Sequence, residues 1–164
     1  MAELTKIESK IGEVTGLAMA AQAATKKVSG LAKKEHPELV SRLEKMHDEA
    51  AETERRCTEL AGTFEGKKTA ILEEARTTKG KGADMMSTYL DKDSDALDGF
   101  EFLTMAEAGE VGHWSVLKAL NKKAGSAEIR QLVAWALPIQ QSHLRGVTET
   151  SLELASEDDP NAPA

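Results

Sequence analysis

Apolar residues recur every three or four positions over stretches of roughly thirty residues, and this spacing restricts the chain to long amphipathic helices. Residues three or four apart lie on one face of an α-helix, so each series forms a stripe that must pack against another helix. The first stripe consists of Ile7, Ile11, Val14, Ala18, Ala21, Ala24 and Val28. No long stretch alternates apolar with polar residues, so the sequence does not predict strands.

Signals for helix starts and stops predict four long helices, at residues 3–33, 37–60, 96–123 and 127–155. Pro37 suits the first turn of the second helix, and Asp95 and Ser126 suit the N-caps of the third and fourth. Pro138 lies inside the fourth helix and should kink it, because proline cannot donate a backbone hydrogen bond.

The connection between the second and third helices is long. Glycine, lysine and threonine are frequent in it, and we expect a short helical piece at residues 68–77 and a second short piece between Gly82 and Asp91. Such a connection favours a bundle whose second and third helices run in the same direction. We therefore predict an all-α protein, a four-helix bundle over residues 1–155 with a long crossover between helices 2 and 3. The acidic, proline-containing residues 156–164 should form a disordered tail.

The composition of the chain limits which partners and which compartment we expect. The formal net charge is −7, which repels nucleic acid and anionic lipid, so we expect neither nucleic acid nor membrane as a partner. Cys57 is the only cysteine, so no internal disulfide can form. The start of the chain lacks the basic-then-apolar pattern of a secretion signal. These features together favour a soluble cytoplasmic protein.

The two halves of the chain resemble each other. Gly12-Glu13-Val14 in the first helix matches Gly109-Glu110-Val111 in the third, and Glu44-x-x-His47 in the second matches Gln140-x-x-His143 in the fourth. The separation from Glu13 to His47 differs by a single residue from the separation between Glu110 and His143. The repeat predicts two similar helical hairpins that face each other across a central site.

Polar residues interrupt the apolar stripes at this central level. Glu107 and Glu110 lie within the stripe of the third helix, and Gln140 and His143 within that of the fourth. An unpaired buried charge costs several kcal/mol, so a bound cation would stabilise such a group of side chains. We predict as metal ligands Glu13, Glu44, His47, Glu107, Glu110, Gln140 and His143, with Glu49, Glu52 and His113 as further candidates.

This order of carboxylates and histidines resembles that of the ferritin-like superfamily, with the Glu-x-x-Glu of rubrerythrin-type sites at Glu107 and Glu110. Over residues 7–155 the chain is similar to the YciE/YciF type of ferritin-like stress proteins, through His36-Pro37-Glu38-Leu39, Leu43-Glu44, Gly66-Lys67-Lys68 and Lys118-Ala119-Leu120. The resemblance implies a cofactor of two iron ions, with manganese or zinc as alternatives. It also implies oxidoreductase chemistry on peroxide or dioxygen, a role in stress response, and a homodimer.

The sequence departs from this pattern at one ligand position and leaves another open. Gln140 stands where the motif has glutamate, and a neutral amide is a poorer ligand for a hard cation. Asp48, Glu49 or Glu52 could face inward instead of Glu44. Two alternatives therefore remain: a single bound metal ion, or a non-catalytic helical bundle with a degraded site. A DNA-protecting shell is disfavoured by the acidic charge.

Overall fold

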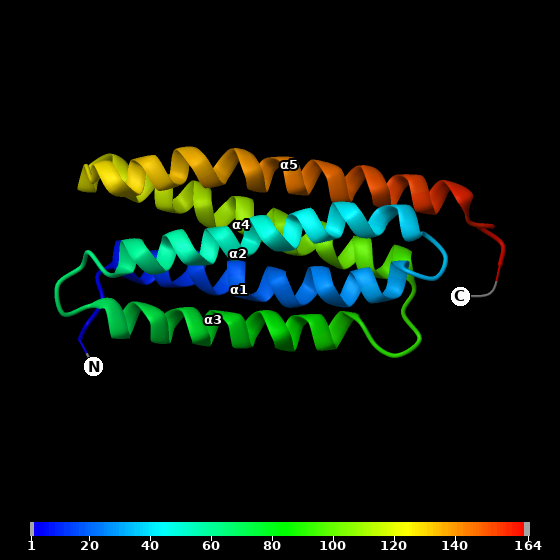
Figure 1. The fold of residues 1–164 in the computed structure, drawn as a ribbon, viewed down its shortest axis with the longest axis horizontal. Helices are drawn as coiled ribbons and strands as arrows, with labels where there is room; N and C mark the ends of the chain where they lie inside the picture. The colour runs from blue at the N-terminus through cyan, green and yellow to red at the C-terminus, as the bar shows by residue number, and fades with distance from the viewer. Residues whose placement is uncertain (1, 163–164) are drawn as a thin grey trace.

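The computed structural model describes residues 2–162, and the long helices in it run along a common axis (Figure 1). Those residues contain no strand, which confirms the predicted all-α class. The four predicted helices are present with ends shifted by a few residues, and a fifth, α3, lies between the second and third. The elements are α1 (Lys6–Ala32), the 3-10 helix η1 (Pro37–Leu39), α2 (Val40–Ala61), α3 (Lys68–Tyr89), α4 (Ala96–Ala124) and α5 (Ala127–Glu157).

Side chains near the helix ends fix where α1 and α4 begin. Thr5 and Glu8 cap each other's backbone N–H groups at the start of α1, and Asp95 and Asp98 do the same for α4. Gly125 adopts a φ of 72°, a left-handed conformation that glycine tolerates best, and α4 ends there. The predicted caps at Asp95 and Ser126 are confirmed.

Helix α3 is a single continuous helix, whereas the sequence predicted two short pieces, one at residues 68–77 and one between Gly82 and Asp91. Its buried residues face α1, and apart from Ile71 they are small: Ala70, Ile71, Ala75 and Thr78. At Gly12 of α1 a Cβ atom would lie 2.7 Å from the backbone oxygen of Ile71, so α1 and α3 are too close for any side chain there. Close packing on α1 thus stabilises a helix that its own glycines and threonines disfavour.

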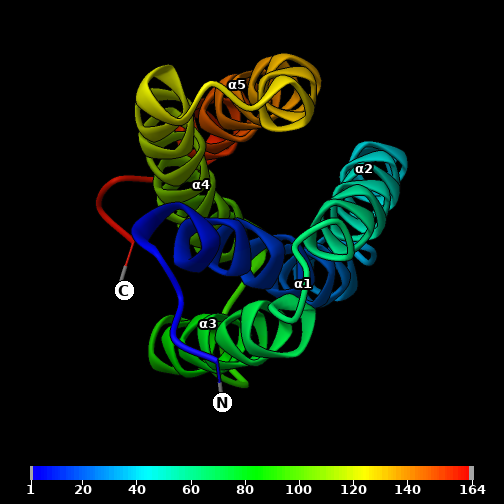
Figure 2. The same cartoon turned by 90° about the vertical axis from the view of Figure 1, so that its left-hand side faces the viewer.

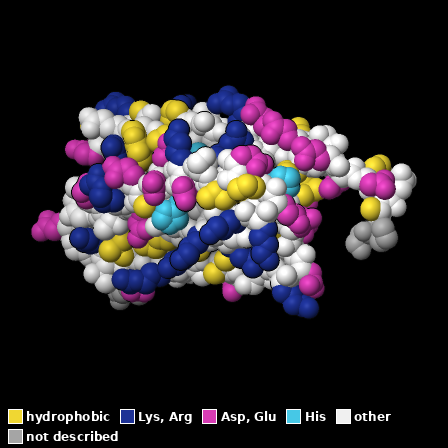
Figure 3. Space-filling model, turned by 45° about the vertical axis from the view of Figure 1, so that its right-hand side comes forward, with side chains coloured by type: hydrophobic (Ala, Val, Ile, Leu, Met, Phe, Trp, Pro, Cys, Tyr) yellow, Lys and Arg dark blue, Asp and Glu magenta, His cyan; other side chains and the backbone are white. Residues whose placement is uncertain are grey.

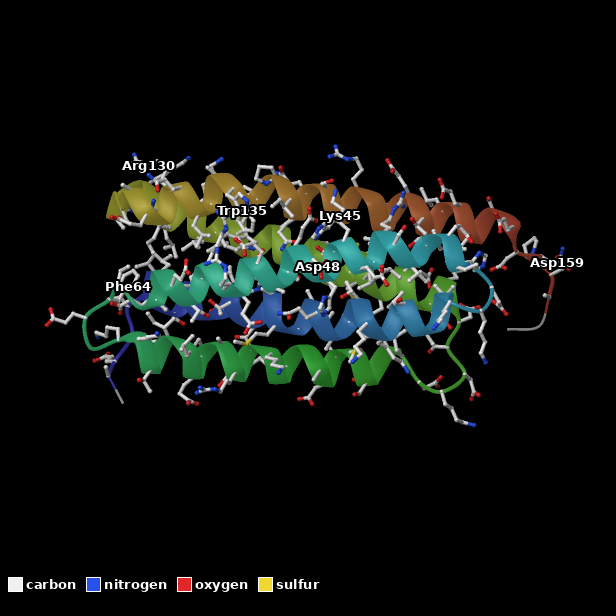
Figure 4. All side chains as sticks on the ribbon, viewed as in Figure 1. Lys45, Asp48, Phe64, Arg130, Trp135 and Asp159 are labelled. Atoms are coloured by element: carbon white, nitrogen blue, oxygen red, sulfur yellow. The ribbon has the colours of Figure 1, made fainter. Side chains whose placement is uncertain are left out.

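Helix α1 lies at the centre and packs against α2, α3 and α4, while α5 packs chiefly on α4 (Figure 2). The colours in Figure 1 show that α2 and α4 run in the same direction, as predicted, with α3 as the connection between them. Contacts between α2 and α5 are sparse, and a groove of about 860 Å³ separates them. One contact does join α2 and α5. The guanidinium of Arg56 in α2 lies 4.0 Å from the ring centre of Trp135 in α5 (Figure 4).

The apolar core consists of two clusters. One surrounds Trp114 and Leu117 of α4, and the other surrounds Phe100 and Leu103 of the same helix. All four main helices contribute to both clusters, so each helix has an apolar segment on either side of its middle. None of the helices within residues 2–162 is long and apolar enough to span a membrane.

Candidate functional site

A layer of buried polar side chains separates the two apolar clusters. Glu107 and Glu110 lie between the clusters on α4, and Gln140 and His143 lie between them on α5. Both pairs are three residues apart, so each pair shares a helix face. The prediction that these four side chains lie in the core is confirmed.

The two carboxyl groups of α4 are almost completely removed from water. Glu107 is 2% exposed and Glu110 is 3% exposed. Burial, together with the negative charge of Glu107, raises the pKa of Glu110 well above its ordinary value. Glu110 is therefore held in its neutral form at a pH where an exposed glutamate is charged.

Gln140 and Glu110 are joined directly. The side-chain amide nitrogen of Gln140 donates a hydrogen bond to Oε2 of Glu110 at 2.8 Å. Two nearby buried oxygens, Oε2 of Glu107 and Oε1 of Gln140, have no hydrogen-bond partner within the described residues. Because a buried polar atom without a partner costs free energy, a ligand bound at these two oxygens would stabilise the protein.

His143 lies between two carboxylates. Its Nε2 is 2.6 Å from Oε2 of Glu49, and its Nδ1 is 3.6 Å from Oε2 of Glu107, which is too long for a hydrogen bond. Burial lowers the pKa of His143, but the carboxylates of Glu107 and Glu49 together outweigh burial and raise it. Glu49 is half-buried and lines the groove between α2 and α5, so this ion pair connects the core to solvent.

Helix α2 presents Glu49 to the core, whereas the residues first predicted there face elsewhere. Glu44 is exposed, and the prediction that it lies in the core is wrong. His47 is 41% exposed at its side chain and lies 3.3 Å from Asp48. The buried residues of α2 include the residue directly before Glu44 and the residue directly before His47. They are Leu43, Met46, Ala50, Thr53, Cys57 and Leu60.

Glu52 also points away from the polar layer. Its carboxylate accepts hydrogen bonds from Arg55 and Arg56, each at 2.7 Å. These hydrogen bonds lower the pKa of Glu52 to about 2. The side chain is thus engaged in surface ion pairs and is not directed at His143.

Glu13 and His113 form a separate pair at the seam between α1 and α4. Oε2 of Glu13 lies 2.9 Å from Nδ1 of His113, and Lys10 contacts both side chains. The predicted equivalence of Glu13 and Glu110 therefore fails, because Glu110 is buried, whereas Glu13 is partly exposed and paired with Lys10 and His113. The neighbouring glycines differ too, since Gly12 packs on α3 while Gly109 is exposed.

Five of the predicted metal ligands lie in or beside the buried layer: Glu49, Glu107, Glu110, Gln140 and His143. Glu49, Glu107, Glu110 and His143 supply carboxylate oxygens and an imidazole, which suit iron, manganese or zinc. The other predicted ligands, Glu13, Glu44, His47, Glu52 and His113, lie outside this layer. Within residues 2–162, no three histidine, cysteine, aspartate or glutamate side chains are already arranged around a common point that could hold a metal ion.

The buried stripe of α2 does not by itself distinguish Glu49 from Glu44, because Glu44 directly follows Leu43 and Glu49 directly precedes Ala50. What the sequence could not show was that α2 would turn the edge that carries Glu49 toward His143.

Comparisons with protein-family models, with curated proteins and with solved structures find no match to this chain.

Proposed function

We propose that this chain is a ferritin-like bundle that binds a divalent metal ion, iron or manganese, in the polar layer between α4 and α5. The course of the chain supports this: α1 with α2 and α4 with α5 form two hairpins, and α3 serves as the long crossover of such bundles. In this proposal Glu107, Glu110 and His143 hold the ion, and Glu49 closes the site from the groove side.

The observation that carries the proposal is the buried Oε2 of Glu107, which has no hydrogen-bond partner among the described residues. A cation at this oxygen would neutralise Glu107 and allow Glu110 to ionise beside it. The side chains of Glu110 and His143 would have to turn from Gln140 and Glu49 toward the ion. A bound iron ion would supply redox chemistry with peroxide or dioxygen, which would reach the site through the groove that Glu49 and His143 line.

Anaerobic titration of Fe(II), followed by metal analysis, tests the proposal. We expect one ion per chain, and we expect Glu107→Gln to weaken binding by at least about tenfold. Glu44→Gln is the matched control, because it removes the same charge from an exposed position of α2. Absence of stoichiometric binding, or equal weakening in both variants, would refute the metal site. Parallel titrations with Mn(II) and Zn(II) rank the metals.

A second candidate function is a non-catalytic helical bundle. It is favoured by the pairing of Gln140 with Glu110 and of His143 with Glu49, which satisfies much of the layer without a metal. On this view His143→Leu leaves the stability unchanged or raises it. The melting temperature would then be the same for metal-free and metal-treated protein, whereas a bound ion would raise it.

The homodimer and the role in stress response belong to the same proposal and rest on the family resemblance. Sedimentation velocity distinguishes a monomer, a dimer and a large shell. A shell of twelve or more subunits would contradict the proposed dimer. Peroxide consumption by the iron-loaded protein, compared with the Glu107→Gln variant, tests the oxidoreductase activity.

A further inference from the structure

A pocket of about 450 Å³ lies where α4 meets α5, near the turn that joins them and away from the polar layer. This volume falls in the usual range for small-molecule sites, roughly 300–1,000 Å³. The turn beside it is held in place, because the side chain of Asn121 hydrogen-bonds both the backbone N–H and the backbone oxygen of Ser126. The pocket walls therefore belong to a well-fixed part of the fold.

The floor of the pocket is apolar. Val133 and Leu137 belong to the buried core cluster around Trp114, and they form the base of the pocket. Ala134 and Pro138, which are exposed, continue the apolar lining along α5. A hydrocarbon chain placed here would cover apolar surface that water now contacts, and such burial is favourable.

The charged residues that line the pocket are all basic: Lys118 and Lys122 from α4, and Arg130 from α5. On the face shown in Figure 3, by contrast, acidic and basic side chains lie interspersed. Within residues 2–162, these three cations make no ion pair of 4.0 Å or less. In a chain of net charge −7, three cations without acidic neighbours in the lining are unexpected.

Helix stability does not account for these cations. Lys122 lies in the last turn of α4, where a positive charge is favourable, but Lys118 lies one turn earlier and repels it. Arg130 lies in the first turn of α5, where a positive charge is unfavourable, and it projects outward near the start of that helix (Figure 4). Glu128, in the same turn, accepts a hydrogen bond from the Ser126 hydroxyl and, within the described residues, makes no ion pair of 4.0 Å or less with Arg130. An anion between the three cations would relieve their repulsion.

We propose that this pocket binds a small amphipathic carboxylate. Its hydrocarbon chain packs on Val133 and Leu137, and its carboxylate lies among Lys118, Lys122 and Arg130. The site is independent of the metal site, and it can be tested on protein stripped of metal.

Isothermal titration of metal-free protein with octanoate measures this binding. We expect the double variant K118Q/K122Q to bind octanoate roughly three- to tenfold more weakly, as expected for two exposed charge pairs. The double variant K81Q/K123Q is the control, because it removes the same charge from exposed lysines outside the pocket. Equal weakening in the two double variants would overturn the proposal.

Two further titrations separate the apolar and the charged contributions. Ala134→Phe fills the pocket from an exposed position and should abolish octanoate binding without lowering the melting temperature. We expect 1-octanol, which has the same chain and no charge, to bind at least about threefold more weakly than octanoate. Octanol binding as tight as that of octanoate overturns the proposal. The proposal is also overturned if the protein binds phosphatidylglycerol vesicles and octanoate does not inhibit that binding.

Discussion

Gln140 donates a hydrogen bond to Glu110 at 2.8 Å, and both side chains are buried in the middle of the bundle. In the ferritin-like pattern that the sequence resembles, a glutamate stands at the position of Gln140. Because the amide is neutral, the protein keeps Glu107 and Glu110 together in its core without adding another negative charge. Under the proposed function, this pair is the point at which metal-free stability and metal binding would oppose each other.

Gln140→Glu should destabilise the metal-free protein. A third carboxyl group in the layer must either ionise at a buried site or take up a proton, and we expect a loss of about 1–3 kcal/mol near neutral pH. Urea unfolding measures the change. Gln131→Glu, at an exposed position of α5, is the control and should change the stability by less than about 0.5 kcal/mol. If the metal site exists, Mn(II) should raise the free energy of unfolding of Gln140→Glu more than that of the wild type.

Stability should fall as the pH rises, and Glu110 should be one cause. Its folded pKa is raised, so between pH 4.5 and that raised pKa the folded protein binds a proton that the unfolded chain has released. The free energy of unfolding therefore decreases across this interval. The raised pKa of His143 acts in the same direction above pH 6.5. Urea unfolding at a series of pH values measures the slope.

Glu110→Gln removes the first of these two contributions and should flatten the slope between pH 4.5 and 6.5. Glu101→Gln, at an exposed position of α4, should leave the slope unchanged. A slope that is the same in the wild type and in Glu110→Gln would show that Glu110 ionises normally in the folded protein.

Gly12→Ala should destabilise the protein, although alanine is the better helix former. A Cβ atom at Gly12 would lie 2.7 Å from both the backbone oxygen of Ile71 and Cβ of Glu74, so α1 and α3 would have to separate. We expect a loss of about 1–3 kcal/mol, measured by urea unfolding.

Gly109→Ala is the natural comparison, because Gly109 matches Gly12 in the sequence repeat. A Cβ atom there would meet nothing within 4 Å, so the variant should gain up to about 1 kcal/mol. Opposite signs for the two variants would establish that only the first half of the repeat uses its glycine for close packing.

Cys57 should react slowly with thiol reagents in the native protein. Burial raises the pKa of its thiol to about 12, and the thiolate is the reactive form. Compared with the ordinary value of 9.0, the thiolate fraction is lower by about a thousandfold at a given pH. Absorbance of released thionitrobenzoate measures the rate, and unfolding in guanidinium should make the reaction fast. A native rate equal to the unfolded rate would contradict the buried position of Cys57.

The sequence alone determined the helical class, most helix ends and the polar residues of α4 and α5. Apolar spacing identified Glu107, Glu110, Gln140 and His143 as core residues because their stripes have apolar residues on both sides along the helix. The caps at Asp95 and Ser126 were readable because capping is a local interaction between residues near in sequence.

Only the tertiary structure decided what faces these residues. The rotation of α2 about its axis brings Glu49 to His143 and leaves Glu44 in solvent, and this rotation depends on how Leu43, Met46 and Cys57 pack against other helices. The length of α3 was likewise settled by its contacts with α1, not by its own residues. Contacts between distant segments are fixed by packing of whole helices, so a motif repeated in the sequence need not have the same surroundings twice.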